Sequence, residues 1–307
     1  MNPLVKILCY VAVIILAACV ISPPVYWMCQ GLIHAGWLSG LQGFPFHRYF
    51  TRIAQITALI LAWPLVRWLR IRSFGELNLY RNRLWRRDLP AGFGAGFLPL
   101  ALLAGVYLGL DVYHFRHDIF WMNLLRIAIT AIVVSVTEEF LFRGVLLGLA
   151  LRATNPFRAV FWTSVIFALV HFLRPVTAHV GPQAVTWMSG FRMAGDLFGS
   201  FAAYPKPVFG GMLTLTAAGM ILGFCTVKTR SLWLAIGMHA AWVFGQQTLN
   251  LVARFQIKPE NALFPWVGPA QVSGAVPIGI WALLMLGVSG LLLRWYLHER
   301  TSASISS

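Results

Sequence analysis

The chain of 307 residues is 59% hydrophobic and only 11% charged, with a mean hydropathy of +0.73. These values place it among integral membrane proteins and exclude an ordinary water-soluble domain. Its net charge of +15 arises from 24 Lys and Arg against 9 Asp and Glu. The arginines lie in short stretches between apolar runs. This distribution favours an anionic lipid surface as the partner and argues against nucleic acid.

The apolar runs predict an all-α, polytopic transmembrane bundle of about eight helices, forming a single integral membrane domain over residues 1–307. A helix needs about 20 predominantly apolar residues to cross the hydrocarbon core of a bilayer. The spans are expected at residues 4–22, 51–70, 91–111, 123–151, 156–174, 208–227, 231–252 and 275–297.

Basic residues predict the orientation of this bundle. Seven arginines lie between Arg67 and Arg87, in the loop after the second span. Lys and Arg are concentrated in cytoplasmic loops. Alternation of eight spans places a further seven basic residues, from Lys6 to Arg300, on the same side. We therefore expect both termini in the cytoplasm, with a bacterial inner membrane as the location.

The fourth span carries three ionisable residues at its centre, in the sequence SVTEEFLFRG (135–144). Each such residue costs roughly 2.5–3.5 kcal/mol at the centre of a membrane helix, and intramembrane charges usually mark a functional site. Glu139 and Arg143 stand four residues apart and predict an ion pair on one helix face. Glu138 projects about 100° away from that face. It is left without an intrahelical partner of opposite charge and is the candidate for chemistry.

Two histidines lie within later spans, His171 in the fifth and His239 in the seventh. A single histidine in an apolar helix is more often a packing residue, but ionisable residues in a bundle tend to face its interior and meet. Counting about 1.5 Å per residue puts Glu138 about 20 Å and His171 about 22 Å from the cytoplasmic helix ends, and His239 about 12 Å. Convergence of all three therefore requires a tilted seventh helix or a different starting point for it.

These side chains allow two forms of hydrolysis. A carboxylate and an imidazole that share a water can polarise it for attack on a carbonyl, and a second imidazole can stabilise the oxyanion. Alternatively, Glu138, His171 and His239 could bind a divalent metal such as Zn²⁺ with one position open for water. The usual HExxH helix is absent. The residues thus leave metal-dependent and metal-free mechanisms open.

The order EExxxR (138–143), FxxxH (167–171) and a histidine in a late span resembles the CPBP family of intramembrane proteases. This family includes CAAX prenyl proteases and the Abi bacteriocin-immunity proteins. The resemblance covers a protease-like core of about 123–250. It implies an endopeptidase that cleaves a membrane-associated, in some cases lipidated, protein or peptide.

By this resemblance, Glu138 and His171 would activate the water and His239 would stabilise the oxyanion. Glu139 and Arg143 would form the charged framework of the site.

The resemblance is incomplete at one position. The family commonly has Asn or Asp four residues after the third-motif histidine, where this chain has Val243. Gln246 lies seven residues after His239 on the same helix face and could supply the missing amide. Two other functions stay open: a non-catalytic immunity or binding protein, and a proton-coupled transporter with Glu138 as the proton carrier.

Overall fold

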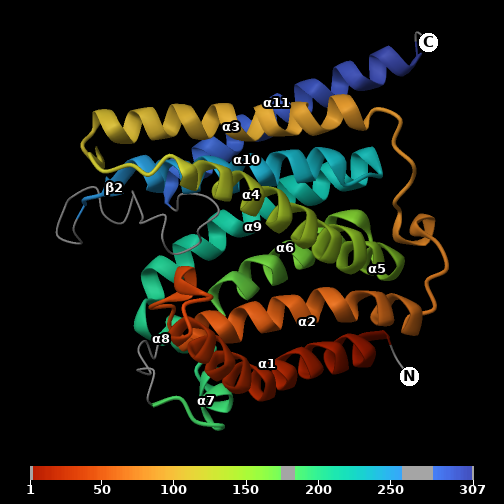
Figure 1. The fold of residues 1–307 in the computed structure, drawn as a ribbon. Coiled ribbons are helices and arrows are strands. Elements are labelled where there is room, and N and C mark those ends of the chain that lie inside the picture. The colour runs from red at the N-terminus through yellow and green to blue at the C-terminus, as the bar shows by residue number, and fades with distance from the viewer. Residues whose placement is uncertain (1–2, 174–183, 258–278, 306–307) are drawn as a thin grey trace. The chain divides into compact units, whose positions relative to one another are not determined.

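The computed structural model describes residues 3–173, 184–257 and 279–305 (Figure 1). Within these ranges the secondary structure is almost entirely helical, so the expected all-α bundle is confirmed. The chain forms two compact units. One comprises Met1–Arg72 and Leu173–Pro205, and the other comprises Ser73–Phe172 and Lys206–Ser307. The expectation of a single integral membrane domain stays a prediction.

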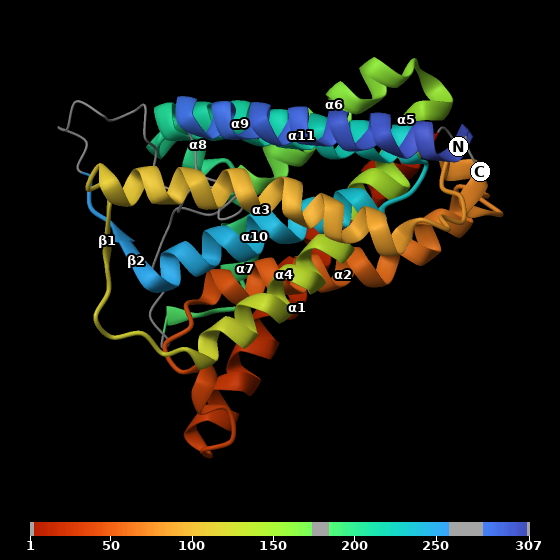
Figure 2. The same ribbon diagram turned by 90° about the horizontal axis from the view of Figure 1, so that it is seen from above.

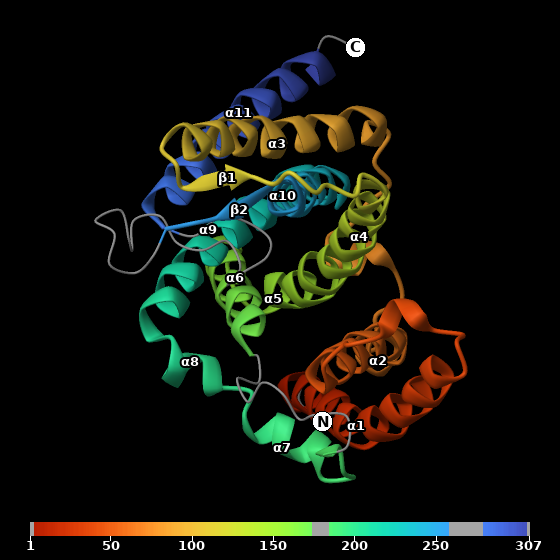
Figure 3. The ribbon, with the colours of Figure 1, turned by 60° about the vertical axis from the view of Figure 1, so that its left-hand side comes forward.

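The first unit is built on an antiparallel pair of long helices. It contains α1 (Pro3–His34), η1 (Ser39–Leu41), α2 (Phe46–Trp68), α7 (Ser189–Gly195) and α8 (Gly199–Ala203). Figure 3 shows α7 beside α1. The ring of Tyr26 packs edge-on against Phe46 and Tyr49, with centroids 5.6 and 5.0 Å apart. This aromatic cluster holds the end of α1 to the start of α2.

The second unit contains all the residues that the sequence proposes for the site. Its helices are η2 (Phe74–Leu77), α3 (Trp85–Gly109), α4 (Met122–Glu139), the π-helix η3 (Phe140–Leu146), α5 (Leu147–Ala153), α6 (Pro156–Phe172), α9 (Pro205–Thr229), α10 (Trp233–Val252) and α11 (Ile280–Ile305). Strands β1 (Tyr113–Phe115) and β2 (Ala253–Phe255) pair in antiparallel fashion at the ends of α3 and α10.

Among the described residues, five helices are long and apolar enough to span a bilayer: Val5–His34, Phe46–Trp68, Trp85–Gly109, Val208–Thr229 and Ile280–Arg300. The shorter α6 is also apolar. Membrane character is therefore confirmed, whereas the count of eight spans stays a prediction. In place of the fourth predicted span, α4, η3 and α5 follow one another without a break. Helix α10, the seventh predicted span, carries five polar side chains, at His239, Gln246, Gln247, Thr248 and Asn250, which lower its hydropathy.

Helices α3 and α10 run parallel and in close contact (Figures 1 and 2). Glycines on both helices permit this approach. A Cβ atom added at Gly92 would lie 2.2 Å from the carbonyl oxygen of Leu234, and one at Gly237 would lie 2.1 Å from that of Leu89. Small residues let membrane helices approach until their backbones touch. Thus α10, which carries His239, rests directly on the backbone of α3.

A buried carboxylate fixes the arginine-rich end of the same helices. Asp88, in the first turn of α3, is fully buried and accepts hydrogen bonds from Arg300 and Tyr296 of α11. It also accepts one from Asn82, whose amide in turn donates to Ser231. Ser231 precedes α10. This network holds the C-terminal helix and the start of α10 to the start of α3.

The glycine contact predicts a difference between two neighbouring positions of α3. Gly92→Ala should lower the stability of the purified protein by about 1–3 kcal/mol, because its methyl group would displace the backbone of α10. Gly94→Ala is the matched control, since no atom lies within 4 Å of its added Cβ. It should be neutral or slightly stabilising, because Ala favours helix more than Gly does. Thermal unfolding in detergent measures both changes. Equal melting temperatures would contradict this packing.

Candidate active site

A π-helical turn lies directly after the two glutamates. Helix α4 ends at Glu139 and continues into η3 without leaving helical backbone angles, since Phe140 has φ −61° and ψ −46°. The sequence predicted one helix over 123–151, and the helical backbone does run from Met122 to Ala153. The π-turn itself was not predicted. Such turns are rare and are frequent at functional sites.

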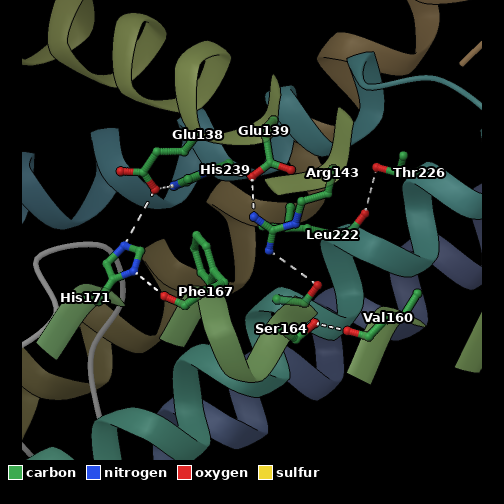
Figure 4. Close-up of polar contacts among 11 residues, drawn as sticks. Glu138, Glu139, Arg143, Val160, Ser164, Phe167, His171, Leu222, Thr226 and His239 are labelled. Atoms are coloured by element: carbon green, nitrogen blue, oxygen red, sulfur yellow. Dashed lines mark hydrogen bonds and ion pairs between the residues drawn. The ribbon is translucent and has the colours of Figure 1, made fainter. Parts of the chain in front are cut away.

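The carboxylate of Glu139 is the centre of a buried network (Figure 4). Its Oε1 atom accepts hydrogen bonds from Arg143 Nη1 at 3.0 Å and from His239 Nδ1 at 2.8 Å. Glu139 is fully buried, and Arg143 and His239 are almost so. The predicted ion pair between Glu139 and Arg143 is therefore present, and the same carboxylate links α4 to α10.

Arg143 extends this network to two further helices. Its Nη2 atom donates to the carbonyl oxygen of Gly219 in α9 at 3.4 Å. Its guanidinium carbon lies 4.2 Å from the ring centroid of Phe167 in α6. A cation over an aromatic face is attracted by the ring quadrupole, more strongly when both groups are desolvated. One arginine thus joins η3, α6 and α9.

Glu138 faces the two histidines. Its Oε2 atom lies 3.6 Å from His171 Nε2 and 3.8 Å from His239 Nε2. Both distances exceed that of a direct hydrogen bond. The side chains of Glu138 and His171 are 21% and 13% exposed, whereas that of His239 is 2% exposed. The open side of the site is therefore formed by Glu138 and His171.

The second nitrogen of each histidine fixes how its ring presents to Glu138. His171 Nδ1 lies 2.8 Å from the carbonyl oxygen of Phe167, which can only accept, so Nδ1 is the donor. His239 Nδ1 likewise donates to the carboxylate of Glu139. The Nε2 atoms of both rings are thereby turned toward Glu138. The two rings differ in the acceptor of their Nδ1–H group, which is a neutral carbonyl for His171 and a carboxylate for His239.

Residues 120–245 match the family model of Rce1-like, type II CAAX prenyl endopeptidases. This segment, about two fifths of the chain, is similar to Rce1-like endopeptidases. The match agrees with the resemblance to the CPBP and CAAX proteases. The family is one of intramembrane endopeptidases that act on membrane-associated proteins. No curated protein and no solved structure matches the chain.

The matched segment contains five of the six residues that the sequence proposed for the site, and Gln246 lies one residue beyond it. Glu138, Glu139, Arg143, His171 and His239 lie in one connected cluster. Their catalytic roles stay predictions.

Neither of the two positions considered for the missing amide contributes a polar contact to the cluster. Val243, one turn after His239, is buried and apolar. Gln246, just beyond the matched segment, is fully buried, and its Nε2 atom donates to Asn250 Oδ1 at 3.3 Å. Its position is about 10 Å along α10 from His239. Among the described residues no hydrogen bond links Gln246 to the glutamates or histidines.

Two contributors to the cluster were not given a role from the sequence. Phe167 accepts from His171 through its carbonyl and stacks under Arg143 through its ring. Its position four residues before His171 in the FxxxH motif was the available signal. Gly219 supplies a backbone carbonyl from α9, and no sequence pattern pointed to it.

Glu138, His171 and His239 are the metal ligands that the sequence predicts. Glu138 Oε2 lies 3.6 and 3.8 Å from the Nε2 atoms of the two histidines. Nevertheless, no group of three His, Cys, Asp or Glu side chains in the described ranges has the arrangement to hold a metal ion. A Zn²⁺ cofactor stays a prediction from the sequence.

The buried network predicts unequal effects for two arginines that both pair with glutamates. Arg143→Leu should destabilise the protein by about 3–5 kcal/mol, because it leaves the carboxylate of Glu139 buried with one partner lost. Arg152→Leu is the control. Arg152 is half exposed and lies 3.8 Å from Glu76, and such a surface pair contributes about 0–1 kcal/mol. Denaturant or thermal unfolding in detergent measures both. Comparable losses would show that the buried pair is not a structural centre.

Proposed function

We propose that the chain is an intramembrane endopeptidase in which Glu138 and His171 activate a water molecule and His239 stabilises the oxyanion. The observation that supports this most directly is the position of Glu138 Oε2, within 3.8 Å of the Nε2 atoms of both histidines. A water held at this point could be hydrogen-bonded by the carboxylate and by an imidazole at once.

Glu138 and His171 are suited to accept the proton of the water. With Nδ1 of His171 donating to a carbonyl, its Nε2 atom carries a lone pair when the ring is neutral. The carboxylate of Glu138 is likewise an acceptor. The water would give up a proton to this pair as its oxygen attacks the scissile carbonyl carbon. The same proton can then pass to the leaving amine.

His239 is suited to the opposite role. Its Nδ1–H donates to the buried carboxylate of Glu139, which stabilises positive charge on the ring during the reaction. A doubly protonated ring can donate from Nε2 to the oxygen of the tetrahedral intermediate. Donors placed where charge develops supply a large part of the rate enhancement in acyl transfer. Glu139 and Arg143 act on the reaction through His239, as positioning residues.

The substrate that we propose is the C-terminal part of a membrane-associated protein that carries a prenyl group. This follows from the type of endopeptidase that residues 120–245 match. The polar cluster lies among apolar helices, so a lipid-modified chain can reach it from the bilayer without leaving an apolar environment. The identity of the substrate protein stays open.

Replacement of Glu138 tests the proposal. Glu138→Gln keeps the shape of the side chain but removes its basicity, and should lower kcat/KM by about 10²–10⁴-fold. The assay is cleavage of prenylated CAAX peptides by the purified protein in liposomes. Glu76→Gln is the control and should retain activity, because Glu76 contacts Arg152 at the end of α5 and not the cluster. Full activity of Glu138→Gln would refute the role of Glu138, whereas absence of cleavage in the unmodified protein would favour a binding protein.

Restoring the family's usual residue tests the oxyanion assignment. Val243 lies one helical turn after His239, so Val243→Asn places an amide donor beside it. We expect kcat to rise several-fold, since one well-placed oxyanion donor is worth about 10²–10³-fold when it is removed from an enzyme that has it. Stability should fall by about 1–3 kcal/mol, because an amide is buried in place of the apolar isopropyl group of valine. A fall in kcat at unchanged folding would place the oxyanion elsewhere.

A further inference from the structure

Helix α10 carries a buried polar line that the proposed chemistry does not use. It consists of Trp242, Gln246 and Asn250, which follow His239 at intervals of three, four and four residues. Gln246 and Asn250 project within about 20° of the direction of His239, and Trp242 within about 60°. Trp242 and Gln246 are almost completely buried, and Asn250 is partly exposed. The line covers about 16 Å, from the site to the end of α10.

Two atoms of this line are buried without a hydrogen-bond partner among the described residues. They are the indole Nε1 of Trp242, a donor, and the Oε1 of Gln246, an acceptor. An unpaired buried polar atom costs about 1–3 kcal/mol. The amide nitrogen of Gln246 donates to Asn250 of the same helix and so makes no hydrogen bond to another described helix. A donor and an acceptor one turn apart suit a small molecule that both accepts and donates.

Helix α4, which contacts α10 on the side of His239, carries mostly small side chains on its buried face. The residues of α4 buried on the face of Glu139 are Ile127, Ala131 and Ser135, at intervals of four. Two of these three side chains are small. The hydroxyl of Ser135 donates to its own helix, at the carbonyl of Ile132. It adds a polar oxygen on the same face as Glu139.

We propose that this line holds ordered water molecules and supplies the site with water from the end of α10 remote from Lys228 and Arg230. The need for such a path rests on the proposed function. Each peptide bond cleaved consumes one water, and the exposed side of the site, at Glu138 and His171, is where a substrate must enter. A bound substrate would close that side. The polar line reaches His239 from another direction.

Thiol labelling tests the path without using enzymatic activity. In a chain with its four cysteines, Cys9, Cys19, Cys29 and Cys225, replaced by Ala, single cysteines are introduced and exposed in membrane vesicles to a small water-soluble thiosulfonate. Gln246→Cys should react at least about tenfold faster than Leu249→Cys, because reactivity follows access to water and thiolate formation. Leu249 is the matched control. It is buried at nearly the same depth and turned about 60° away.

Each outcome of this experiment decides the proposal. Slow reaction at both positions, or equally fast reaction at both, would overturn it. If Gln246→Cys fails to accumulate in the membrane, Asn250→Cys provides the same comparison at the open end of the line.

A kinetic measurement separates this proposal from the endopeptidase itself. Gln246→Leu should lower kcat about tenfold at an unchanged KM, because it removes a water-binding group without touching the substrate. Absence of cleavage in the unmodified protein, with Gln246→Cys still labelled, would overturn the proposed function and leave the hydrated line intact. Unchanged kcat in Gln246→Leu, in an active enzyme, would overturn the supply role.

Discussion

One carboxylate oxygen constrains the second unit more than any other atom. Glu139 Oε1 accepts from Arg143 and from His239, and all three side chains are buried. A charge taken out of water costs several kcal/mol unless partners surround it. The separation of α4 and α10 is therefore set by this oxygen. The direction of His239 Nε2 follows from the bond that Nδ1 makes.

Two adjacent glutamates acquire different roles from this arrangement. Successive residues on a helix project about 100° apart, so only one of the pair can reach Arg143 and His239. Glu139 occupies that position and is closed off from solvent, whereas Glu138 is partly exposed and faces two imidazole nitrogens at 3.6 and 3.8 Å. Neighbouring carboxylates in unlike surroundings are a recurrent basis for dividing structural and chemical tasks. The surroundings supply this distinction, since the two side chains are identical.

What could be predicted from the sequence was mainly local. The pair Glu139 and Arg143 follows from helical spacing alone, and the bounds of the helices that contain the site were predicted within two residues at each end. The depth of His239 was not predicted. Counting from the helix ends gave about 12 Å for His239 and about 20 Å for Glu138, yet His239 Nε2 lies 3.8 Å from Glu138 Oε2. Because the helix boundaries were right, the difference comes from tilt and from the level at which each helix begins. No periodicity in a single chain encodes either quantity.

The depth of each helix relative to its neighbours is fixed by contacts between helices that are distant in sequence. Residues 120–245 carry the match to the Rce1-like family, but α3 and α11 lie outside this segment. Nevertheless α10 rests on the backbone of α3 through Gly92 and Gly237, and Asp88 joins the start of α3 to α11 and, through Asn82, to the turn before α10. Helix α10 contacts the backbone of α3 on one face and the carboxylate of Glu139 on another. A displacement of α3 must therefore move His239 or break a buried hydrogen bond. The residues that perform the proposed chemistry belong to the matched segment. The position of α10, which carries His239, is nevertheless fixed by α3, a helix outside that segment.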